Sequence, residues 1–293
     1  MRKAMFHTIS EFVRKDERII VMLADIGAAG FKDLMQEYPE RVLNIGVFED
    51  GMISVAAGCA IKGMIPVVYG ITPYIAERAL EQLKIDFAYQ NLGATFISTG
   101  AAYDFSKLGY SHYCPEDAAI LKQIPGIEFI APGTPEQMES LLRQTFYNGH
   151  PTFFRMSDYI NQNNTTVQYG KAEVVKTGKK ATVISVSTML DIVMTACEDF
   201  DVTILYYTTL SPFDTEALVN YSAANKFLIC EPQQEGTITY DVVKAFEGKP
   251  ISIEHIGIPR EIIRSYGTKD EKDIFFGMIF ENIRNRIELM IES

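Results

Sequence analysis

The chain alternates short, continuous runs of apolar residues with segments whose apolar positions recur every three to four residues. Residues 18–24 (RIIVMLA) form the clearest apolar run, and such a run is typical of a strand buried on both faces of a parallel sheet. Similar runs predict further strands in the first half of the chain at residues 42–45, 66–69, 94–98, 127–131 and 152–155.

Helical patterns separate these strands. The expected helices are an opening one around residues 5–13, a short one from Phe31 to before Pro39, and longer ones at residues 51–62, 75–89 and 134–148. The last of these begins with Thr134, Pro135 and Gln137. They predict an N-cap, a proline at the first helical position and a capping-box partner.

A polar stretch at residues 161–170 (NQNNTTVQYG) divides the chain, and such low apolar content marks a linker between domains. Beyond it, strands are predicted from Ala181, Val202, Lys226 and Ile251, with helices between them and a final helix over residues 270–292. Strands that alternate with helices twice over predict two doubly wound α/β domains. We expect these at residues 1–160 and 172–293, with residues 161–171 as the linker.

Composition narrows the class of protein. The chain has 293 residues, of which 47% are hydrophobic and 22% are charged, as in ordinary globular proteins. Lys and Arg number 27 against 38 Asp and Glu, a net charge of −11, and this acidity argues against nucleic-acid binding. Residues 53–71 carry a single charge, Lys62, but their glycines and Pro66 favour a buried helix, a turn and a strand over a membrane span.

Cysteine usage points to a reducing compartment. The four cysteines are Cys59, Cys114, Cys197 and Cys230, and none forms a CxxC pair, so neither a zinc site nor a redox dithiol is indicated. Residues 1–18 lack the apolar core of a signal peptide. We therefore expect a cytoplasmic protein.

Common catalytic motifs find no match. Residues 25–30 (DIGAAG) follow a strand but lack the first glycine of GxGxxG, and the chain contains no GxxxxGK[ST], GxSxG or HExxH. Glu49 is more informative, because it lies at a strand-to-helix junction before a helix of small residues. Two interpretations are open: a glutamate that only interacts with the helix dipole, or a buried acid that contacts a ligand at the carboxyl edge of a parallel sheet.

Around Glu49 the sequence resembles the C-terminal half of transketolase and, more broadly, the pyrimidine-binding and C-terminal domains of thiamine-diphosphate enzymes. Residues 39–60 resemble the family's proline and arginine, short strand, Gly-Ile-x-Glu and Gly/Ala-rich helix. Residues 78–92 look like its next helix, and residues 99–112 have its spacing from a threonine to a histidine. Residues 150–155 look like its closing strand, and residues 210–218 and 228–243 resemble its third domain.

The resemblance implies roles for individual residues. The glutamate that matches Glu49 hydrogen-bonds N1′ of the cofactor's aminopyrimidine and serves in acid–base catalysis. His112 matches a histidine that contacts the substrate or the covalent intermediate, so it is a catalytic candidate beside Glu49. Arg155 matches an arginine that binds the substrate's phosphate. The residues matched to the cofactor's surroundings are Asp25, Ile26, Thr72, Tyr74 and Ile75. Without the resemblance, two simpler interpretations are open: Asp25 caps the next turn, which is equally favoured, and Arg155 forms an ion pair with an acidic neighbour.

The match departs from the family where rings and sugars are bound. Thr72 and Ile75 stand where transketolases stack aromatic rings on the pyrimidine, and a one-residue shift would bring Tyr74 there instead. Gly100 and Leu108 replace a histidine and an aspartate that contact sugar substrates. These differences imply a substrate other than the usual sugar phosphates, contacts supplied from elsewhere, or a degenerate site.

The family's diphosphate-binding domain, with its Gly-Asp-Gly motif and Mg²⁺ ligands, finds no match in this sequence. The resemblance therefore implies a partner, an N-terminal transketolase-like subunit that holds Mg²⁺ and the diphosphate, while this chain holds no metal. It also implies an α2β2 assembly with a homodimer of this chain at its centre. The expected activity is ketol transfer between sugar-type substrates with thiamine diphosphate. The alternatives are a β subunit of a 2-oxo acid decarboxylating enzyme and a non-catalytic subunit that retains the fold.

Overall fold

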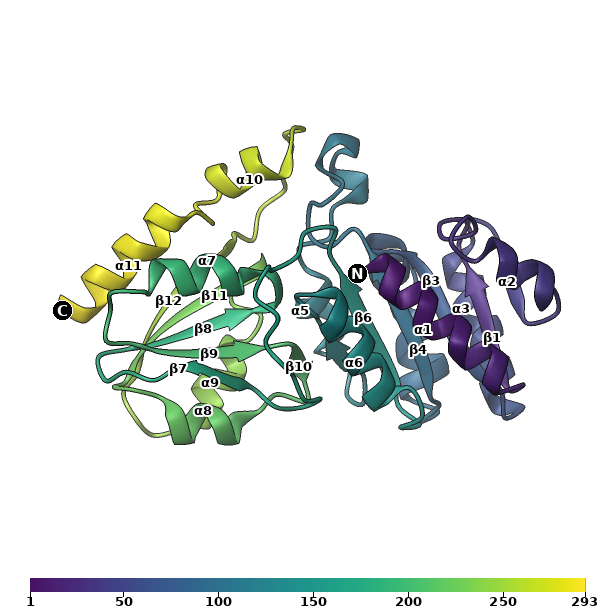
Figure 1. The fold of residues 1–293 in the computed structure, drawn as a ribbon, viewed down its shortest axis with the longest axis horizontal. Helices are drawn as coiled ribbons and strands as arrows, with labels where there is room; N and C mark the ends of the chain where they lie inside the picture. The colour runs from purple at the N-terminus through teal and green to yellow at the C-terminus, as the bar shows by residue number, and fades with distance from the viewer. Residues whose placement is uncertain (293) are drawn as a thin grey trace.

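Two mostly parallel sheets lie side by side in one elongated molecule. The computed structural model describes residues 1–292. Figure 1 shows the first sheet with its helices on one side of the molecule and the second sheet on the other. The predicted architecture, two α/β units each with a doubly covered sheet, is confirmed.

The first sheet has seven strands in the order β10-β5-β6-β4-β3-β1-β2. Its strands from the first half of the chain are β1 (Ile19–Leu23), β2 (Val42–Asn44), β3 (Ile65–Ile71), β4 (Ala94–Thr99), β5 (Glu128–Ile130) and β6 (Pro151–Met156). These strands are parallel. β1 lies between β2 and β3, so that Val21 pairs with Val42 on one side and with Val67 on the other. All five residues of β1 are buried, which explains the continuous apolar run.

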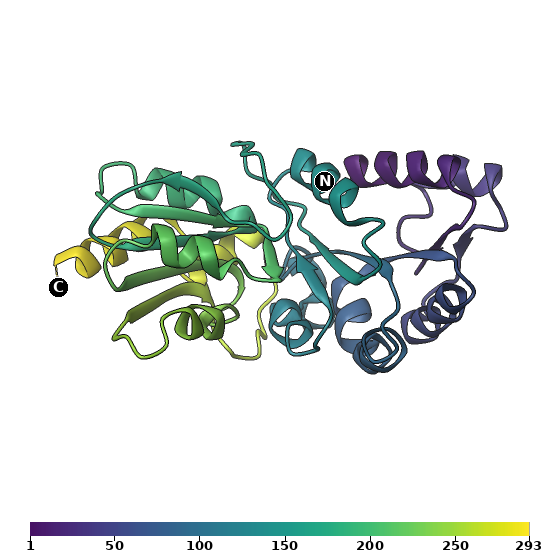
Figure 2. The same cartoon turned by 90° about the horizontal axis from the view of Figure 1, so that it is seen from below.

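Helices cover both faces of this sheet (Figure 2). One face is covered by α1 (Arg2–Lys15), α2 (Lys32–Glu37) and α6 (Pro135–Thr145). The other is covered by α3 (Glu49–Ile61), α5 (Asp117–Leu121) and the helical segment after β3. The helix predicted to open the chain is confirmed, with Met5, Ile9 and Val13 fully buried.

The helical segment after β3 is not the regular α-helix expected over residues 75–89. Two π-helical stretches, η1 (Tyr74–Arg78) and η2 (Leu83–Ala88), flank the short α4 (Leu80–Gln82). A π-turn holds more residues than an α-turn, and such turns are frequent at functional sites. Pattern analysis with a period of 3.6 residues does not detect them.

Helix α6 begins as predicted and ends earlier. The Thr134 hydroxyl accepts a hydrogen bond from the Gln137 N–H at 3.2 Å, which confirms the N-cap. The capping box is wrong in detail, because the Gln137 side-chain oxygen accepts from the N–H of Gly133, not of Thr134. The helix ends at Thr145, three residues before the predicted end.

The second sheet has five strands in the order β12-β11-β8-β9-β7, with β7 antiparallel to β9. The strands are β7 (Glu173–Lys176), β8 (Thr182–Val186), β9 (Thr203–Tyr207), β11 (Lys226–Gln234) and β12 (Ser252–Ile258). Helices α7 (Leu190–Ala196) and α11 (Phe280–Glu292) cover one face, and α8 (Thr215–Tyr221) and α9 (Thr239–Ala245) cover the other. Sequence patterns missed β7, a short edge strand of half-buried residues.

The predicted final helix over residues 270–292 is two helices. Helix α10 (Lys269–Phe275) is separated from α11 by a turn in which Gly277 has a φ of +70°. This left-handed conformation is common where helices end, because glycine adopts it without steric cost. A three-residue 3₁₀ turn, η5 (Ser187–Met189), precedes α7.

The second half of the chain also completes the first sheet. Strand β10 (Thr209–Ser211) leaves β9 and pairs antiparallel with β5. Side chains add to this junction, since the Tyr206 hydroxyl donates to the Gln137 side-chain oxygen at 2.9 Å. The division of the chain at residues 161–171 stays a prediction.

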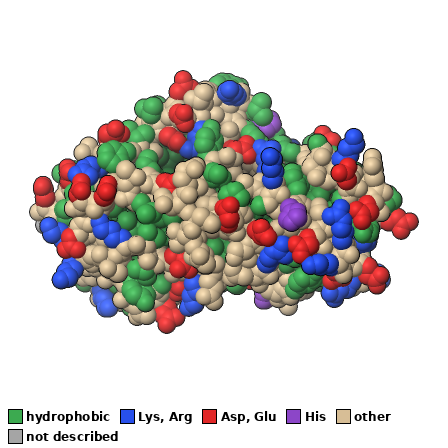
Figure 3. Space-filling model, viewed as in Figure 1, with side chains coloured by type: hydrophobic (Ala, Val, Ile, Leu, Met, Phe, Trp, Pro, Cys, Tyr) green, Lys and Arg blue, Asp and Glu red, His purple; other side chains and the backbone are tan. Residues whose placement is uncertain are grey.

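The surface and the helices bear on the expected class of protein. Acidic and basic side chains are interspersed over the face seen in Figure 3. In the described part of the chain, no helix is both long and apolar enough to cross a lipid bilayer. The four cysteines are free thiols.

We predict that Glu231→Gln changes the pH dependence of stability. Glu231 is fully buried on β11, and burial raises the pKa of its carboxyl to about 8. The folded protein therefore retains a proton that the unfolded chain releases, so this residue lowers stability as pH rises from about 4.5 to about 8. Urea unfolding at pH 5 and pH 8.5 should show a larger loss of stability in the wild type than in the glutamine variant, which keeps only the contributions of other groups such as Asp104 and Glu77. Equal losses in both proteins would contradict this.

Candidate active site

The predicted site residues gather at the carboxyl edge of the first sheet. Asp25 follows β1, Glu49 begins α3 after β2, and Thr72 follows β3. His112 ends a 3₁₀ turn, η4 (Tyr110–His112), in the loop after β4. Because parallel strands end at the same edge, four separate connections bring their side chains to one region.

Glu49 is buried at the first turn of α3. The residue is 1% exposed, and its Oε2 accepts a hydrogen bond from Nη1 of Arg78 at 2.5 Å. The Arg78 side chain is 41% exposed, against 2% for that of Glu49. Sequence analysis missed Arg78 as a site residue, although it lies within the segment matched to the family's helix.

Tyr74 joins Arg78 to His112. The guanidinium carbon of Arg78 lies 4.3 Å from the centre of the Tyr74 ring, in a cation–π contact. On its other side, the Tyr74 hydroxyl lies 3.3 Å from Nε2 of His112. The π-turn η1 carries both Tyr74 and Arg78. A continuous series of contacts therefore runs from Glu49 through Arg78 and Tyr74 to His112.

His112 is held on its second ring nitrogen as well. Its Nδ1 lies 3.0 Å from the hydroxyl of Ser111, and its ring meets the Tyr74 ring edge to face with centres 5.7 Å apart. Hydrogen bonds on both nitrogens fix the orientation of the imidazole, and the tautomer decides which nitrogen donates.

Thr72 and Ile75 face the interior. Thr72 is fully buried, and its hydroxyl donates to the carbonyl of Thr99 at 3.0 Å and lies 3.1 Å from the hydroxyl of Ser98. Ile75 is also fully buried and packs in the core beneath α3. Tyr74, the neighbour that a one-residue shift would select, is the aromatic residue that faces Arg78 and His112.

Asp25 and Ile26 lie at the loop after β1, where Asn44 is a further residue that sequence analysis missed. Asn44 Oδ1 accepts from the N–H groups of Asp25 and Gly46 at 3.0 and 3.1 Å. Its Nδ2 donates to Asp25 Oδ1 at 3.3 Å. Asp25 has a φ of +62°, so Asn44 holds a strained turn. Ile26 is partly buried and packs against the core on the α1 side.

Arg155 is buried at the end of β6 and paired internally. Its Nε donates to Asp117 Oδ2 at 2.7 Å, and its Nη2 donates to the carbonyl of Pro232 at 3.0 Å. The two side chains are 1% and 0% exposed. The ion pair that the sequence left open is therefore present, and it connects β6, α5 and the second sheet.

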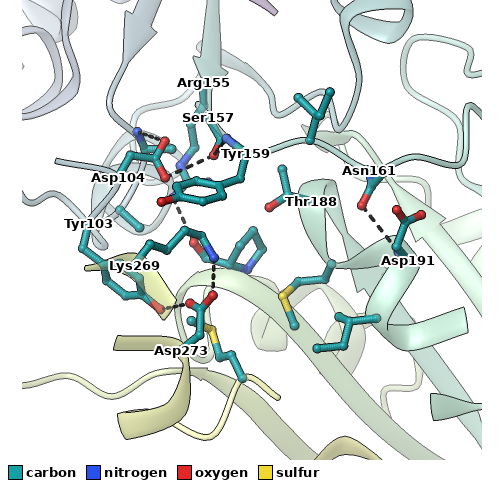
Figure 4. Close-up of a pocket in the computed structure, with 17 residues that line it drawn as sticks. Tyr103, Asp104, Arg155, Ser157, Tyr159, Asn161, Thr188, Asp191, Lys269 and Asp273 are labelled. Atoms are coloured by element: carbon teal, nitrogen blue, oxygen red, sulfur yellow. Dashed lines mark hydrogen bonds and ion pairs between the residues drawn. The ribbon is translucent and has the colours of Figure 1, made fainter. Parts of the chain in front are cut away.

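Arg155 also lines a cavity of about 200 Å³ between the two halves (Figure 4). Asp104 lies on the same wall and accepts from the Ser157 hydroxyl at 3.1 Å, and desolvation raises the pKa of this carboxyl to about 6. Lys269 and Asp273 from α10 also line the cavity and pair with each other. Glu49 and His112 do not line this cavity, which is therefore separate from the series of contacts described above.

The structure shows the surroundings of Gly100 and Leu108, the two positions at which the sequence lacks the family's sugar-binding residues. Gly100 has a φ of +83°, and a Cβ there would lie 2.4 Å from the Phe105 ring. A histidine at this position would require the Phe105 ring to move and would hold its backbone in a strained conformation. Leu108 is 55% exposed.

One group of potential metal ligands occurs among residues 1–292. Glu77, Cys114 and Glu116 place ligand atoms within 4.8 Å of one another. Partial burial and the nearby Glu116 carboxylate raise the pKa of Glu77 to about 7. Mg²⁺ prefers oxygen ligands, so a set that includes a thiol does not fit this ion.

Comparison with known proteins identifies the family. The transketolase pyrimidine-binding domain family matches residues 1–159, more than half of the chain. The chain belongs to the transketolase family. This membership links it to thiamine-diphosphate chemistry.

Individual known proteins are similar over most of the chain. A 33.6 kDa protein from the fasciation locus of Rhodococcoides fascians, itself uncharacterized, is 35% identical over 96% of this chain and 91% of its own. The 6-deoxy-6-sulfo-D-fructose transketolase subunit SqwH of Clostridium sp. is 28% identical over 75% of this chain and 71% of its own. A solved split-gene transketolase, an inactive β4 tetramer, shares the fold with a TM-score of 0.87 at 21% identity, over 99% of this chain and 98% of that one.

We predict that Asn44→Ala destabilises the protein by about 1–2 kcal/mol, because it removes two hydrogen bonds to Asp25 in the loop after β1 and one to Gly46 in the loop before Glu49. Urea unfolding measures this change. Asn220→Ala, at an exposed position of α8, is the matched control and should change stability by less than about 0.5 kcal/mol. Equal effects of the two substitutions would count against the role of Asn44.

The Arg155–Asp117 pair gives a second stability prediction. Asp117→Leu alone should cost about 3–5 kcal/mol, because it leaves a buried guanidinium without its counter-ion. The double variant Asp117→Leu/Arg155→Met should cost less than Asp117→Leu alone, since no buried charge is left. Denaturant titration of the wild type and the two variants checks this, and a double variant that loses as much stability as Asp117→Leu, or more, would contradict the prediction.

Proposed function

We propose that this chain is the C-terminal (β) subunit of a split transketolase that transfers a ketol unit between sugar-type substrates with thiamine diphosphate. The observation that carries the proposal is the buried carboxylate of Glu49, connected through Arg78 and Tyr74 to His112 at the carboxyl edge of the first sheet. A buried acid, an aromatic face and an imidazole form a set suited to a heterocyclic cofactor and its substrate.

The residues present fit the pyrimidine end of this cofactor. Glu49 supplies the carboxyl that would hydrogen-bond the ring and hold or release a proton there. Tyr74 supplies an aromatic face, while the buried Thr72 and Ile75 support the turn that carries it. Asp25 and Ile26 would border the ring from the end of β1. When bound, thiamine diphosphate supplies the electron sink that ketol transfer requires.

His112 and Arg155 are the proposed substrate-binding residues. His112 would accept or donate a hydrogen bond to a substrate hydroxyl beside Glu49. Arg155 would contact a phosphate only by sharing or giving up Asp117, because Asp117 and Pro232 engage two of its nitrogens. The similarity to a subunit named for a sulfo-sugar, together with Gly100 and Leu108, supports a sugar-type substrate outside the common sugar phosphates.

Mg²⁺ and the diphosphate are assigned to a partner subunit. The carboxylate and thiol group at Glu77, Cys114 and Glu116 does not fit Mg²⁺, so the metal ligands would come from an N-terminal subunit with a diphosphate-binding domain. We propose an α2β2 assembly built on a homodimer of this chain. The solved relative is itself described as a β4 tetramer.

Exposed apolar side chains on α3 and the neighbouring η2 support this assembly. They lie just before and along α3 and on η2 and its end: Val47, Phe48, Val55, Ile61, Ile85 and Tyr89. Phe48 is 57% exposed and Val55 is 52% exposed. Apolar exposure on adjoining elements is typical of a protein–protein interface, and Val47 and Phe48 directly precede Glu49 in the chain.

Glu49→Gln should lower the turnover of the reconstituted complex by roughly 10²–10⁴-fold, the usual range for a lost acid–base group. Ketol transfer from a ketose donor measures it. Asp50→Asn, in the same first turn of α3, is the matched control and should retain turnover within about threefold. A Glu49→Gln complex with near-normal turnover would remove Glu49 from the mechanism.

Val55→Asp should disrupt self-association, because a charge cannot be buried in an apolar interface without a partner. Sedimentation or size-exclusion chromatography of the purified chain would show a shift towards the monomer. The matched control is Val219→Asp on α8, where the valine is 45% exposed in the other half of the molecule. If both variants assemble like the unmodified chain, the interface lies elsewhere.

A further inference from the structure

Arg78 makes two contacts at once with the proposed pyrimidine site. Its guanidinium donates to the Glu49 carboxylate at 2.5 Å and lies over the Tyr74 ring at 4.3 Å from the ring centre. An aminopyrimidine is also a planar group that can stack on an aromatic ring and hydrogen-bond a carboxylate. Guanidinium and aminopyrimidine share a flat, delocalised framework with N–H donors at its edge.

Arg78 is also free to leave this position. Its side chain is 41% exposed, whereas the carboxylate that it contacts is 2% exposed. Within residues 1–292, its hydrogen-bonding partner is Glu49. Because the guanidinium stays in contact with solvent, its ion pair and its cation–π contact are screened on that side and hold it only weakly. A ligand that replaces both contacts and keeps Glu49 hydrogen-bonded can displace the side chain into solvent.

We infer that Arg78 occupies the pyrimidine position of the free subunit and competes with the cofactor for Glu49 and Tyr74. This inference rests on the proposed function and extends it, since it names the residue that must move before the cofactor's ring is bound. The fraction of molecules in which Arg78 has swung away sets the apparent affinity for the ring. Arg78 is thus a residue that tunes binding and does not take part in the chemistry.

The direct test is a titration of the full chain with 4-amino-2-methylpyrimidine, followed by calorimetry or by NMR. Arg78→Ala should bind this probe roughly three- to thirtyfold more tightly than the unmodified chain, as expected when a weakly held competitor is removed. Arg78→Gln, which keeps a polar side chain, is the second variant should the alanine variant fold poorly. The matched control is Arg14→Ala, because Arg14 is 47% exposed and paired with Glu37 on the surface; its affinity should equal that of the unmodified chain.

A second probe separates this inference from the proposed function. Methylguanidinium should bind Arg78→Ala and stabilise it in a thermal melt, and it should do neither with Glu49→Gln/Arg78→Ala. The pyrimidine probe should compete with it. In the complex with the diphosphate-binding subunit, Arg78→Ala should lower the Kd of thiamine diphosphate in the same direction.

Each other result has a distinct meaning. Equal or weaker binding of the pyrimidine probe by Arg78→Ala overturns the competition and leaves the proposed function standing, because the site still binds a pyrimidine. Binding of methylguanidinium without any binding of the pyrimidine probe overturns both. If methylguanidinium binds regardless of Glu49, the guanidinium does not sit where the inference places it, and the competition is again overturned.

Discussion

The parallel alignment of β1, β2, β3 and β4 is the constraint on which the site depends. Each strand ends at the same edge, so the residue that follows it is delivered there whatever its position in the chain. Glu49, Tyr74 and His112 lie 25 to 63 positions apart in sequence (49 to 74, and 49 to 112), yet one series of contacts joins them. The core beneath that edge, including Ile75 and Phe96, is fully buried, so the edge is a rigid platform.

The two halves of the chain are joined by backbone as well as by side chains. Strand β10 adds an edge to the first sheet, and Arg155 reaches across to the Pro232 carbonyl. A buried guanidinium on β6 whose partners come from α5 and β11 resists relative movement of these three elements, because any separation leaves a buried charge without its partner. In the loop after β4, the Tyr103 hydroxyl donates to Asp273 Oδ1 at 2.6 Å, so the second half also supports this loop.

Much of the fold is readable from the sequence where burial alone decides the pattern. The run at β1 and the N-cap at Thr134 are local signals with direct physical causes, and both were predicted correctly. Elements decided by distant partners were missed. β10 has only three residues and exists because β5 offers an edge, and the break between α10 and α11 depends on the backbone of Gly277.

The site divides in the same way. Family resemblance indicated Glu49, His112 and Tyr74, whose side chains the structure brings together. Arg78 and Asn44 were missed because their importance lies in contacts across elements, and neither has a motif of its own. The π-turn at Tyr74–Arg78 adds a residue to the helical register, and so it governs which side chains of that segment face Glu49.

The position of β10 has a consequence for how this protein is made. Ribosomes synthesise the chain from its N-terminus, so β5 is made about eighty residues before β10, the strand that pairs with its edge (128 to 209). Until then β5 is an edge strand of the nascent first sheet, with unpaired backbone N–H and C=O groups. Such edges promote aggregation. A fragment that ends after residue 160 would keep this unpaired edge of β5. Expression of the isolated first half therefore requires either that the 209–211 segment is supplied or that charged residues are placed on β5.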